Sequence, residues 1–276
     1  MRNILNEKKR ISILGCGWYG LPLGKKLIEL GYSVKGSTTD ANKLAVLTDC
    51  KIQPFLIRLP YEKVESIDAT FFDSEVLILN IPPERRPDIV DFYFEQMQSI
   101  HAFIKNSNVK NIIFISSTSV YPDRQSSTEE HIEVLPEKES GKALLKAEHF
   151  FLNQKHLKTI VLRFAGLIGA DRNPGRFLAE KRDLKDGNAP VNLVHLEDCI
   201  QITIEFLKRK FENSIFNVCC DEHPLRKDFY YQAAIQLGLT PPTFASSDKT
   251  SAYKIITNAK LKGYLGGYQF RPLSSV

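Results

Sequence analysis

The stretch Ile11-Ser12-Ile13-Leu14-Gly15-Cys16-Gly17-Trp18-Tyr19-Gly20 lies near the start of the chain and decides the fold. A short, mostly apolar run with β-branched residues predicts a buried strand, and glycines spaced G-x-G-x-x-G follow it at once. Apolar residues then recur at helical spacing over residues 21–30, and Gly31 ends the predicted helix. Residues 32–36 begin another strand. Residues 11–36 therefore predict a strand-helix-strand unit with a glycine loop at its first turn.

The three glycines have different expected roles in this setting. Gly15 allows the tight turn, Gly17 lets a pyrophosphate approach the backbone, and Gly20 lets helix and strand pack closely. The start of the helix adds unpaired N–H groups and partial positive charge. We therefore predict that a dinucleotide is held at Gly15, Cys16, Gly17, Trp18, Tyr19 and Gly20. The alternative is a glycine-rich turn without a ligand, and for Trp18 and Tyr19 packing is the more expected role.

The end of the second strand indicates which dinucleotide is preferred. An acidic residue there would hold the ribose 2′-hydroxyl of NAD(H), but the chain has Ser37, Thr38 and Thr39, followed by Lys43. Hydroxyls and an ammonium group suit a 2′-phosphate, so we expect NADP(H) to be favoured. Two alternatives stay open: these residues only cap the next helix, or Asp40 serves NAD(H).

Further apolar runs predict a parallel sheet. Strands are expected at residues 55–57, 76–81, 111–115 and 159–163, with helices at 87–105 and 140–154. Strands that are apolar on both faces and alternate with helices predict a Rossmann-type, doubly wound α/β domain. After residue 170 the pattern loosens, with a helix at 195–208, a strand at 214–218 and a helix at 228–237. We expect an NAD(P)-binding core over residues 1–170, and a region over 171–276 that completes the sheet and forms a small C-terminal substrate lobe.

Composition narrows the class of protein. Of 276 residues, 43% are hydrophobic and 25% charged, which excludes disordered and fibrous classes. The net charge of +5 is scattered and favours a small anionic ligand over nucleic acid. Five cysteines without a C-x-x-C motif predict reduced thiols and no metal site. The first ten residues hold no apolar signal core, and no apolar run approaches the ~20 residues of a membrane helix, so we expect a cytoplasmic protein without a membrane partner. The oligomeric state is left open.

Three more segments carry a family resemblance. Residues 116–121, Ser-Ser-Thr-Ser-Val-Tyr, resemble an S-S-x-x-V-Y segment. Residues 163–169 resemble an R-x-x-x-x-Y-G segment with Ile168 in place of the tyrosine, and residues 192–198 resemble N-F-V-H-V-D-D. Together with the glycine loop, they resemble the extended short-chain dehydrogenase/reductase family, the nucleotide-sugar epimerases and dehydratases. The sequence of residues 35–39 and the short C-terminal region resemble those of an atypical subgroup of this family.

The resemblance implies a sheet of about seven parallel strands, with a small-molecule substrate bound by the C-terminal lobe. It assigns Ser117 to the substrate-facing catalytic position, although a turn-forming serine is an equal alternative. It places five residues at the cofactor: Asn80, Ile81, Pro82, Ser116 and Phe164, the last near the nicotinamide. His195 and Asp198 match a segment that orders the lobe.

The chain departs from the family at its acid/base pair, a tyrosine followed four residues later by a lysine. Alignment on Glu148 puts Ser140 and Leu144 in those positions. Lys142 and Lys146 face other sides of the helix. Tyr121 or His131 remain speculative substitutes. The expected function is an NAD(P)-dependent, epimerase/dehydratase-like oxidoreductase on an unknown small molecule. One alternative is a catalytically silent NAD(P)-binding sensor or interaction protein, and another is a dehydrogenase with a different proton partner.

Overall fold

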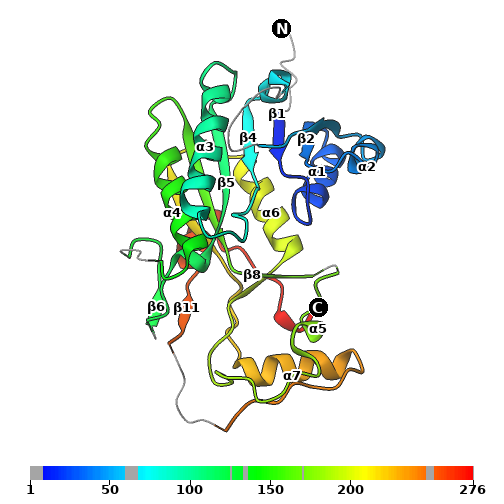
Figure 1. The fold of residues 1–276 in the computed structure, drawn as a ribbon, viewed down its shortest axis with the longest axis vertical. Helices are drawn as coiled ribbons and strands as arrows, with labels where there is room; N and C mark the ends of the chain where they lie inside the picture. The colour runs from blue at the N-terminus through cyan, green and yellow to red at the C-terminus, as the bar shows by residue number, and fades with distance from the viewer. Residues whose placement is uncertain are drawn as a thin grey trace. The chain divides into compact units, whose positions relative to one another are not determined.

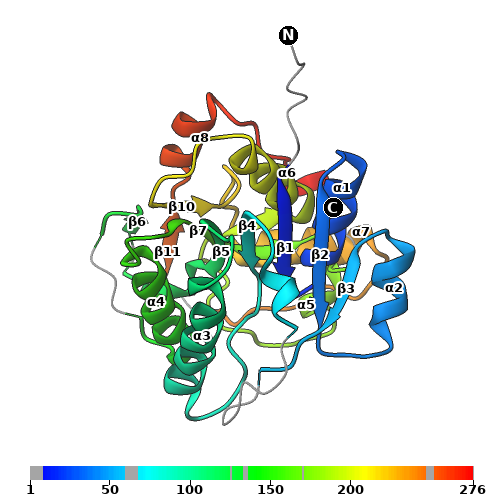
Figure 2. The same ribbon diagram turned by 90° about the horizontal axis from the view of Figure 1, so that it is seen from above.

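The central feature is a seven-stranded parallel sheet (Figures 1 and 2). A computed structural model describes residues 9–59, 68–124, 126–132, 136–169, 171–246 and 252–275; the first eight residues, which entered the localisation argument, lie outside it. The strand order is β10-β7-β5-β4-β1-β2-β3. The bounds are β1 Arg10–Leu14, β2 Ser33–Thr38, β3 Gln53–Leu56, β4 Val76–Leu79, β5 Asn111–Ser117, β7 Lys158–Phe164 and β10 Ser214–Val218. The predicted doubly wound α/β fold is confirmed.

The order of the strands reverses next to β1. The chain runs from β1 through β2 to β3 in one direction, and then returns to place β4 on the other side of β1. Ile13 is in register with Gly36 of β2 and with Ile78 of β4. This reversal is the topological switch point at which ligands of open α/β sheets bind.

Helices cover the sheet, and its central strand is apolar throughout. Helix α1 (Gly20–Glu29) packs on β1 and β2, and α2 (Lys43–Asp49) packs on β2 and β3. Helices α3 (Ile89–Lys105) and α4 (Glu139–Leu152) lie side by side in both views (Figures 1 and 2). The central strand β4 is buried at each of its four positions, as expected for a strand covered on both faces.

The chain forms two compact units that alternate along the sequence. The first comprises residues 1–116, 138–162 and 203–215, and the second residues 117–137, 163–202 and 216–276. In the second unit, short strands pair as β6 (Ser126–Thr128) with β11 (Lys254–Ile256), and β8 (Gly166–Ile168) with β9 (Leu193–His195). Its helices are α5 (Gly175–Leu178), α7 (Arg226–Gln236) and α8 (Ala259–Leu265), and α5 packs against α7. The division at residue 170 stays a prediction.

The structure differs locally from the expected elements where pairing joins residues that are far apart in the sequence. The polar segment after Tyr121, expected to be a loop, contains β6, whose partner β11 lies about 130 residues further along the chain. Three-residue strands are too short to show a periodic pattern. His195, expected to start a helix, is the last residue of β9, and α6 (Leu196–Leu207) starts one residue later. Among the helices that the structure describes, none combines the length and the apolar character needed to cross a bilayer.

Gly36 provides a test of packing within the sheet. A Cβ at Gly36 would lie 2.6 Å from both Cys16 Sγ and Ile52 Cγ2, so we expect Gly36→Ala to destabilise the fold by about 1–3 kcal/mol. The matched control is Gly263→Ala in α8, where a Cβ would meet nothing within 4 Å. Alanine should stabilise that helix by about 0.5–1 kcal/mol. Urea unfolding of both variants checks the prediction, and equal midpoints for the two would contradict it.

Candidate functional site

A hollow of about 560 Å³ opens at the carboxyl ends of β1, β2, β3 and β4, within the first unit. It adjoins the switch point, where the fold leaves a crevice. Ten of the residues assigned to a cofactor line it: Gly15, Cys16, Gly17, Ser37, Thr38, Thr39, Lys43, Asn80, Ile81 and Pro82. The structure therefore brings together residues from four separate segments of the chain.

Gly15 and Gly20 are required by the packing of the protein itself. Gly15 has φ +105°, and a Cβ there would lie 2.4 Å from the Asn80 carbonyl oxygen. A Cβ on Gly20 would lie 2.2 Å from the Gly15 carbonyl oxygen. A side chain at either position would push the loop away from β4 or from α1.

Gly17 is different, because nothing in the protein requires a glycine there. A Cβ on Gly17 would meet no atom within 4 Å, and its φ lies outside the left-handed range. Gly17 lines the hollow, so a side chain would extend into open space. A group that approaches the Gly17 backbone from that space would account for the glycine.

The start of α1 suits an anion. Helical bonding begins when the Leu21 N–H donates to the Gly17 carbonyl, directly after the loop. The first turn carries no acidic side chain, and Tyr19, the residue before the helix, provides no capping side-chain bond. The N–H groups and the dipole of α1 therefore give this end of the loop positive character.

Two neighbouring strands hold Gly15 in place. The Gly15 N–H donates to Ser37 Oγ at 2.9 Å, and Asn80 Nδ2 donates to the Gly15 carbonyl at 2.8 Å. The Cys16 N–H donates to the Ser37 carbonyl at 2.8 Å. Ser37 is buried, so its hydroxyl shapes the loop as well as facing the hollow. Burial also raises the pKa of the Cys16 thiol to about 12, which keeps it protonated at neutral pH.

The rim beside β2 and β3 carries two cations. Lys43 is exposed at the start of α2, as expected from the sequence. Arg58, two residues after the end of β3, is also exposed, and its Nε donates to the Thr39 carbonyl at 3.0 Å. Sequence reasoning missed Arg58, and the available signal was a basic residue at the end of the strand expected at residues 55–57. It also missed Leu14, Ile57, Leu59, Glu84 and Gln96, which complete the lining.

Three residues of the glycine loop lie outside this lining: Trp18, Tyr19 and Gly20. Tyr19 is buried, and its hydroxyl shares a hydrogen bond of 2.6 Å with Thr203 Oγ1. Trp18 is half-buried. The packing role is visible for Tyr19, while cofactor contact by these residues stays a prediction.

The serines after β5 have separate roles. Ser116 is buried in the first unit, and its hydroxyl donates to Glu148 Oε1 on α4 at 2.5 Å. Ser117, in the second unit, accepts a hydrogen bond from the Ser119 N–H at 3.1 Å, so it does form a turn. Its hydroxyl proton is not used in that bond. Phe164 is buried at the end of β7 in the second unit.

The speculative acid/base substitutes are both engaged. The Tyr121 hydroxyl is buried; it donates to Asn217 Oδ1 at 2.8 Å and accepts from Arg163 Nη1 at 2.6 Å. His131 is exposed and lies 3.2 Å from a Glu129 carboxylate oxygen. The cation at the Tyr121 hydroxyl is therefore an arginine, where the family's acid/base pair has a lysine.

Helix α4 offers no ammonium group at the position of the missing lysine. Leu144 is buried, and Ser140 is half-buried. Lys142 pairs with Glu139 at 2.6 Å, and Lys146 pairs with Asp91 at 3.0 Å. Both lysine side chains lie at the exposed side of the helix.

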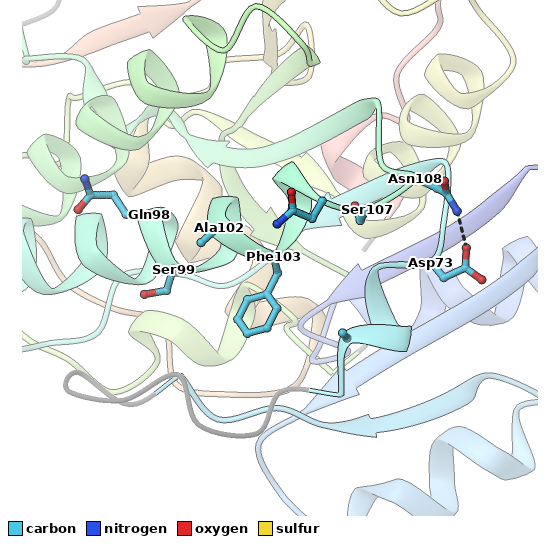
Figure 3. Close-up of a pocket in the computed structure, with 9 residues that line it drawn as sticks. Asp73, Gln98, Ser99, Ala102, Phe103, Ser107 and Asn108 are labelled. Carbon is cyan, nitrogen blue, oxygen red and sulfur yellow. Dashed lines mark hydrogen bonds between the residues drawn. The ribbon is translucent and has the colours of Figure 1, made fainter.

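A second hollow, of about 1010 Å³, lies near the amino-terminal ends of the strands (Figure 3). Asp73 lies shortly before β4 and Asn108 shortly before β5, and the two side chains share a hydrogen bond of 2.8 Å. That bond, together with Arg10, lowers the pKa of Asp73. Phe103 of α3 forms part of the lining, and no lysine or arginine is among the lining residues that the structure describes. The amino-terminal ends lie opposite the carboxyl ends of the strands, where ligands of this fold bind, so the hollow is a weaker candidate for an anionic ligand.

Within the described ranges, no cluster of three or more His, Cys, Asp and Glu side chains is arranged to hold a metal ion. The five cysteines are all free thiols.

Comparison with known proteins places the chain. No family model matches it. Protein YeeZ of Escherichia coli (strain K12) is 36% identical over 266 residues, which span 95% of this chain and 96% of YeeZ. UDP-glucuronic acid 4-epimerase from Bacillus cereus, solved in complex with UDP-glucuronic acid and NAD, superposes with a TM-score of 0.79 at 18% identity over 96% of this chain and 95% of the epimerase.

A short-chain dehydrogenase/reductase superfamily protein from Agrobacterium tumefaciens, with bound NAD, has a TM-score of 0.77 at 16% identity over 96% of this chain and 94% of that protein. These structures share the fold, and the resemblance to extended short-chain dehydrogenases/reductases is confirmed. The chain therefore belongs to the family of the Escherichia coli protein YeeZ, on the fold of the extended short-chain dehydrogenases/reductases.

Proposed function

We propose that this chain binds a nicotinamide dinucleotide at the hollow beside Gly17, with NADP(H) preferred, and that it is an epimerase/dehydratase-like oxidoreductase acting on a small molecule. The observation that carries the proposal is Gly17 itself. Its Cβ position is open space, so the fold does not need glycine there, whereas a backbone that receives a pyrophosphate does.

The chemistry of the surroundings supports a dinucleotide. The start of α1 attracts anions, and the two cations of the rim, Lys43 and Arg58, lie on the same hollow. Two proteins with this fold, the Bacillus cereus epimerase and the Agrobacterium tumefaciens protein, carry NAD in their structures. That likeness supports the class of cofactor, while the preference for the phosphorylated form rests on the rim of this chain.

When bound, a nicotinamide dinucleotide accepts or supplies a hydride. The residues of this chain have supporting tasks. Gly15, Gly17 and the start of α1 bind the pyrophosphate, and Asn80 with Ser37 fixes the loop that does so. Ser117 still has a hydroxyl proton to donate to a substrate oxygen, because its bond with Ser119 uses it as an acceptor.

A second function is favoured by a different observation. Ser140 and Leu144 occupy the positions of the acid/base pair, and the nearby Lys142 and Lys146 are engaged in surface ion pairs. A chain that binds the dinucleotide without moving protons would be a catalytically silent sensor or interaction protein.

The test of cofactor binding uses the single tryptophan of the chain, Trp18, which lies within the glycine loop. Titration with NADP⁺ and NAD⁺ should change its fluorescence. Gly17→Ala should raise Kd about tenfold or more, and Gly17→Val should remove binding, because a side chain blocks backbone bonds to phosphate worth roughly 1.5–3 kcal/mol each.

Both variants should fold, since the Cβ position is open, and their urea midpoints check this. Gly263→Ala is the matched control and should bind like the wild type. If the wild type binds neither dinucleotide, or if Gly17→Val binds as tightly as the wild type, the proposal is wrong.

Turnover with ordinary nucleotide-sugar substrates should be weak or undetectable even when the dinucleotide binds. A serine is a poor proton donor at neutral pH, and general acid–base help is worth about 10²–10⁴ in rate. Ser140→Tyr combined with Leu144→Lys should add carbonyl reductase activity with NADPH, which absorbance at the nicotinamide band measures.

Ser140→Phe combined with Leu144→Met is the matched control, because its side chains are similar in size to tyrosine and lysine but carry no proton donor or ammonium group. Robust wild-type turnover that survives Ser117→Ala would show that the chemistry uses other residues.

A further inference from the structure

The rim of the hollow at β2 and β3 contains a guanidinium group held in place by the backbone. Arg58 lies two residues after the end of β3, and its Nε donates to the carbonyl of Thr39, just beyond the end of β2. That bond uses one of five N–H donors, and the structure records no partner for Nη1 or Nη2 among the described residues. A planar fork that is already oriented loses less side-chain freedom when it binds a phosphate.

The hydroxyls beside Arg58 are partly committed to structure. Ser37 Oγ accepts from the Gly15 N–H, and Thr38 Oγ1 accepts from the Asp40 N–H at 3.1 Å. Ser37 and Thr38 are both buried, whereas Thr39, Lys43 and Arg58 are exposed. The groups that a ligand meets first at this rim are therefore the two cations and Thr39.

Two acids of the described residues lie near the rim, Asp40 and Glu84. Asp40 is outside the lining of the hollow, and its Oδ1 accepts from the Asn42 N–H at 3.0 Å. Glu84 does line the hollow, but it follows β4, which is three positions from β3 in the sheet. Adjacent strands are about 4.8 Å apart, so the end of β4 lies roughly 14 Å from the end of β3.

We infer that Arg58, supported by Lys43, forms a phosphomonoester site that recognises the 2′-phosphate of NADP(H). This rests on the proposed dinucleotide site and names the residue that sets its specificity. Arg58 lies in the segment after β3, so the discriminating charge is separate from the Ser37-Thr38-Thr39 segment at the end of β2. Bidentate Arg–phosphate bonds give a geometry that a lysine alone does not.

Titrations of Trp18 fluorescence test the inference with NADP⁺, NAD⁺, 2′,5′-ADP and 5′-AMP. Arg58→Met should raise Kd for NADP⁺ and 2′,5′-ADP by about 10- to 100-fold, and should leave NAD⁺ and 5′-AMP within about twofold. Lys43→Met should cause a smaller selective loss. Arg10→Met removes one positive charge at the amino-terminal end of β1 and should change none of the four Kd values.

The outcomes separate the two proposals. Wild-type binding of neither NADP⁺ nor NAD⁺ would overturn the dinucleotide site and this inference with it. Tighter NAD⁺ binding by the wild type would overturn the inference and the proposed preference for NADP(H), would leave the dinucleotide site itself in place, and would point to Asp40 at the ribose. An equal loss of NADP⁺ and NAD⁺ in Arg58→Met, no loss at all, or a larger selective loss in Lys43→Met would also overturn it. Urea midpoints of each variant establish that the chain is folded.

Discussion

The hydrogen bonds at Gly15 connect the carboxyl ends of the strands where the candidate site lies. At φ +105° Gly15 turns the chain out of β1, and both of its backbone groups are bonded to the neighbouring strands. The hydroxyl of Ser37 in β2 accepts a hydrogen bond from the Gly15 N–H, and the side chain of Asn80, just after β4, donates one to the Gly15 carbonyl. Because β1 lies between β2 and β4, these two bonds link three adjacent strand ends and aim α1 at the hollow.

That arrangement divides the work of the site between buried and exposed groups. The buried hydroxyls of Ser37 and Thr38 keep backbone N–H groups satisfied, as unpaired buried donors would cost about 1–3 kcal/mol each. The exposed charges of Lys43 and Arg58 remain for an incoming anion. Gly17 is the one glycine of the loop without a packing reason, because a Cβ there would meet no atom within 4 Å.

Helix α4 is held in place by buried residues other than a tyrosine and a lysine. Glu148 is fully buried and accepts a hydrogen bond from Ser116, so the helix is held against the end of β5. Leu144 is also buried and contributes to the same packing. The helix therefore does not depend on a tyrosine or lysine for its position, and function has to be argued from the residues present.

Local pattern alone determined much of this protein. The glycine loop, the apolar strands and the helical spacing predicted the doubly wound fold and seven lining residues of the hollow, because backbone turns and burial on both faces depend on neighbouring residues. The family resemblance added Asn80, Ile81 and Pro82. Tertiary structure decided what those residues contact. The bond between Gly15 and Ser37, the placement of Arg58 against Thr39, and the pairing of β6 with β11 all depend on which strands lie side by side. Strand order is set by packing between distant segments, and that is why a periodic pattern located the hollow without revealing its second cation.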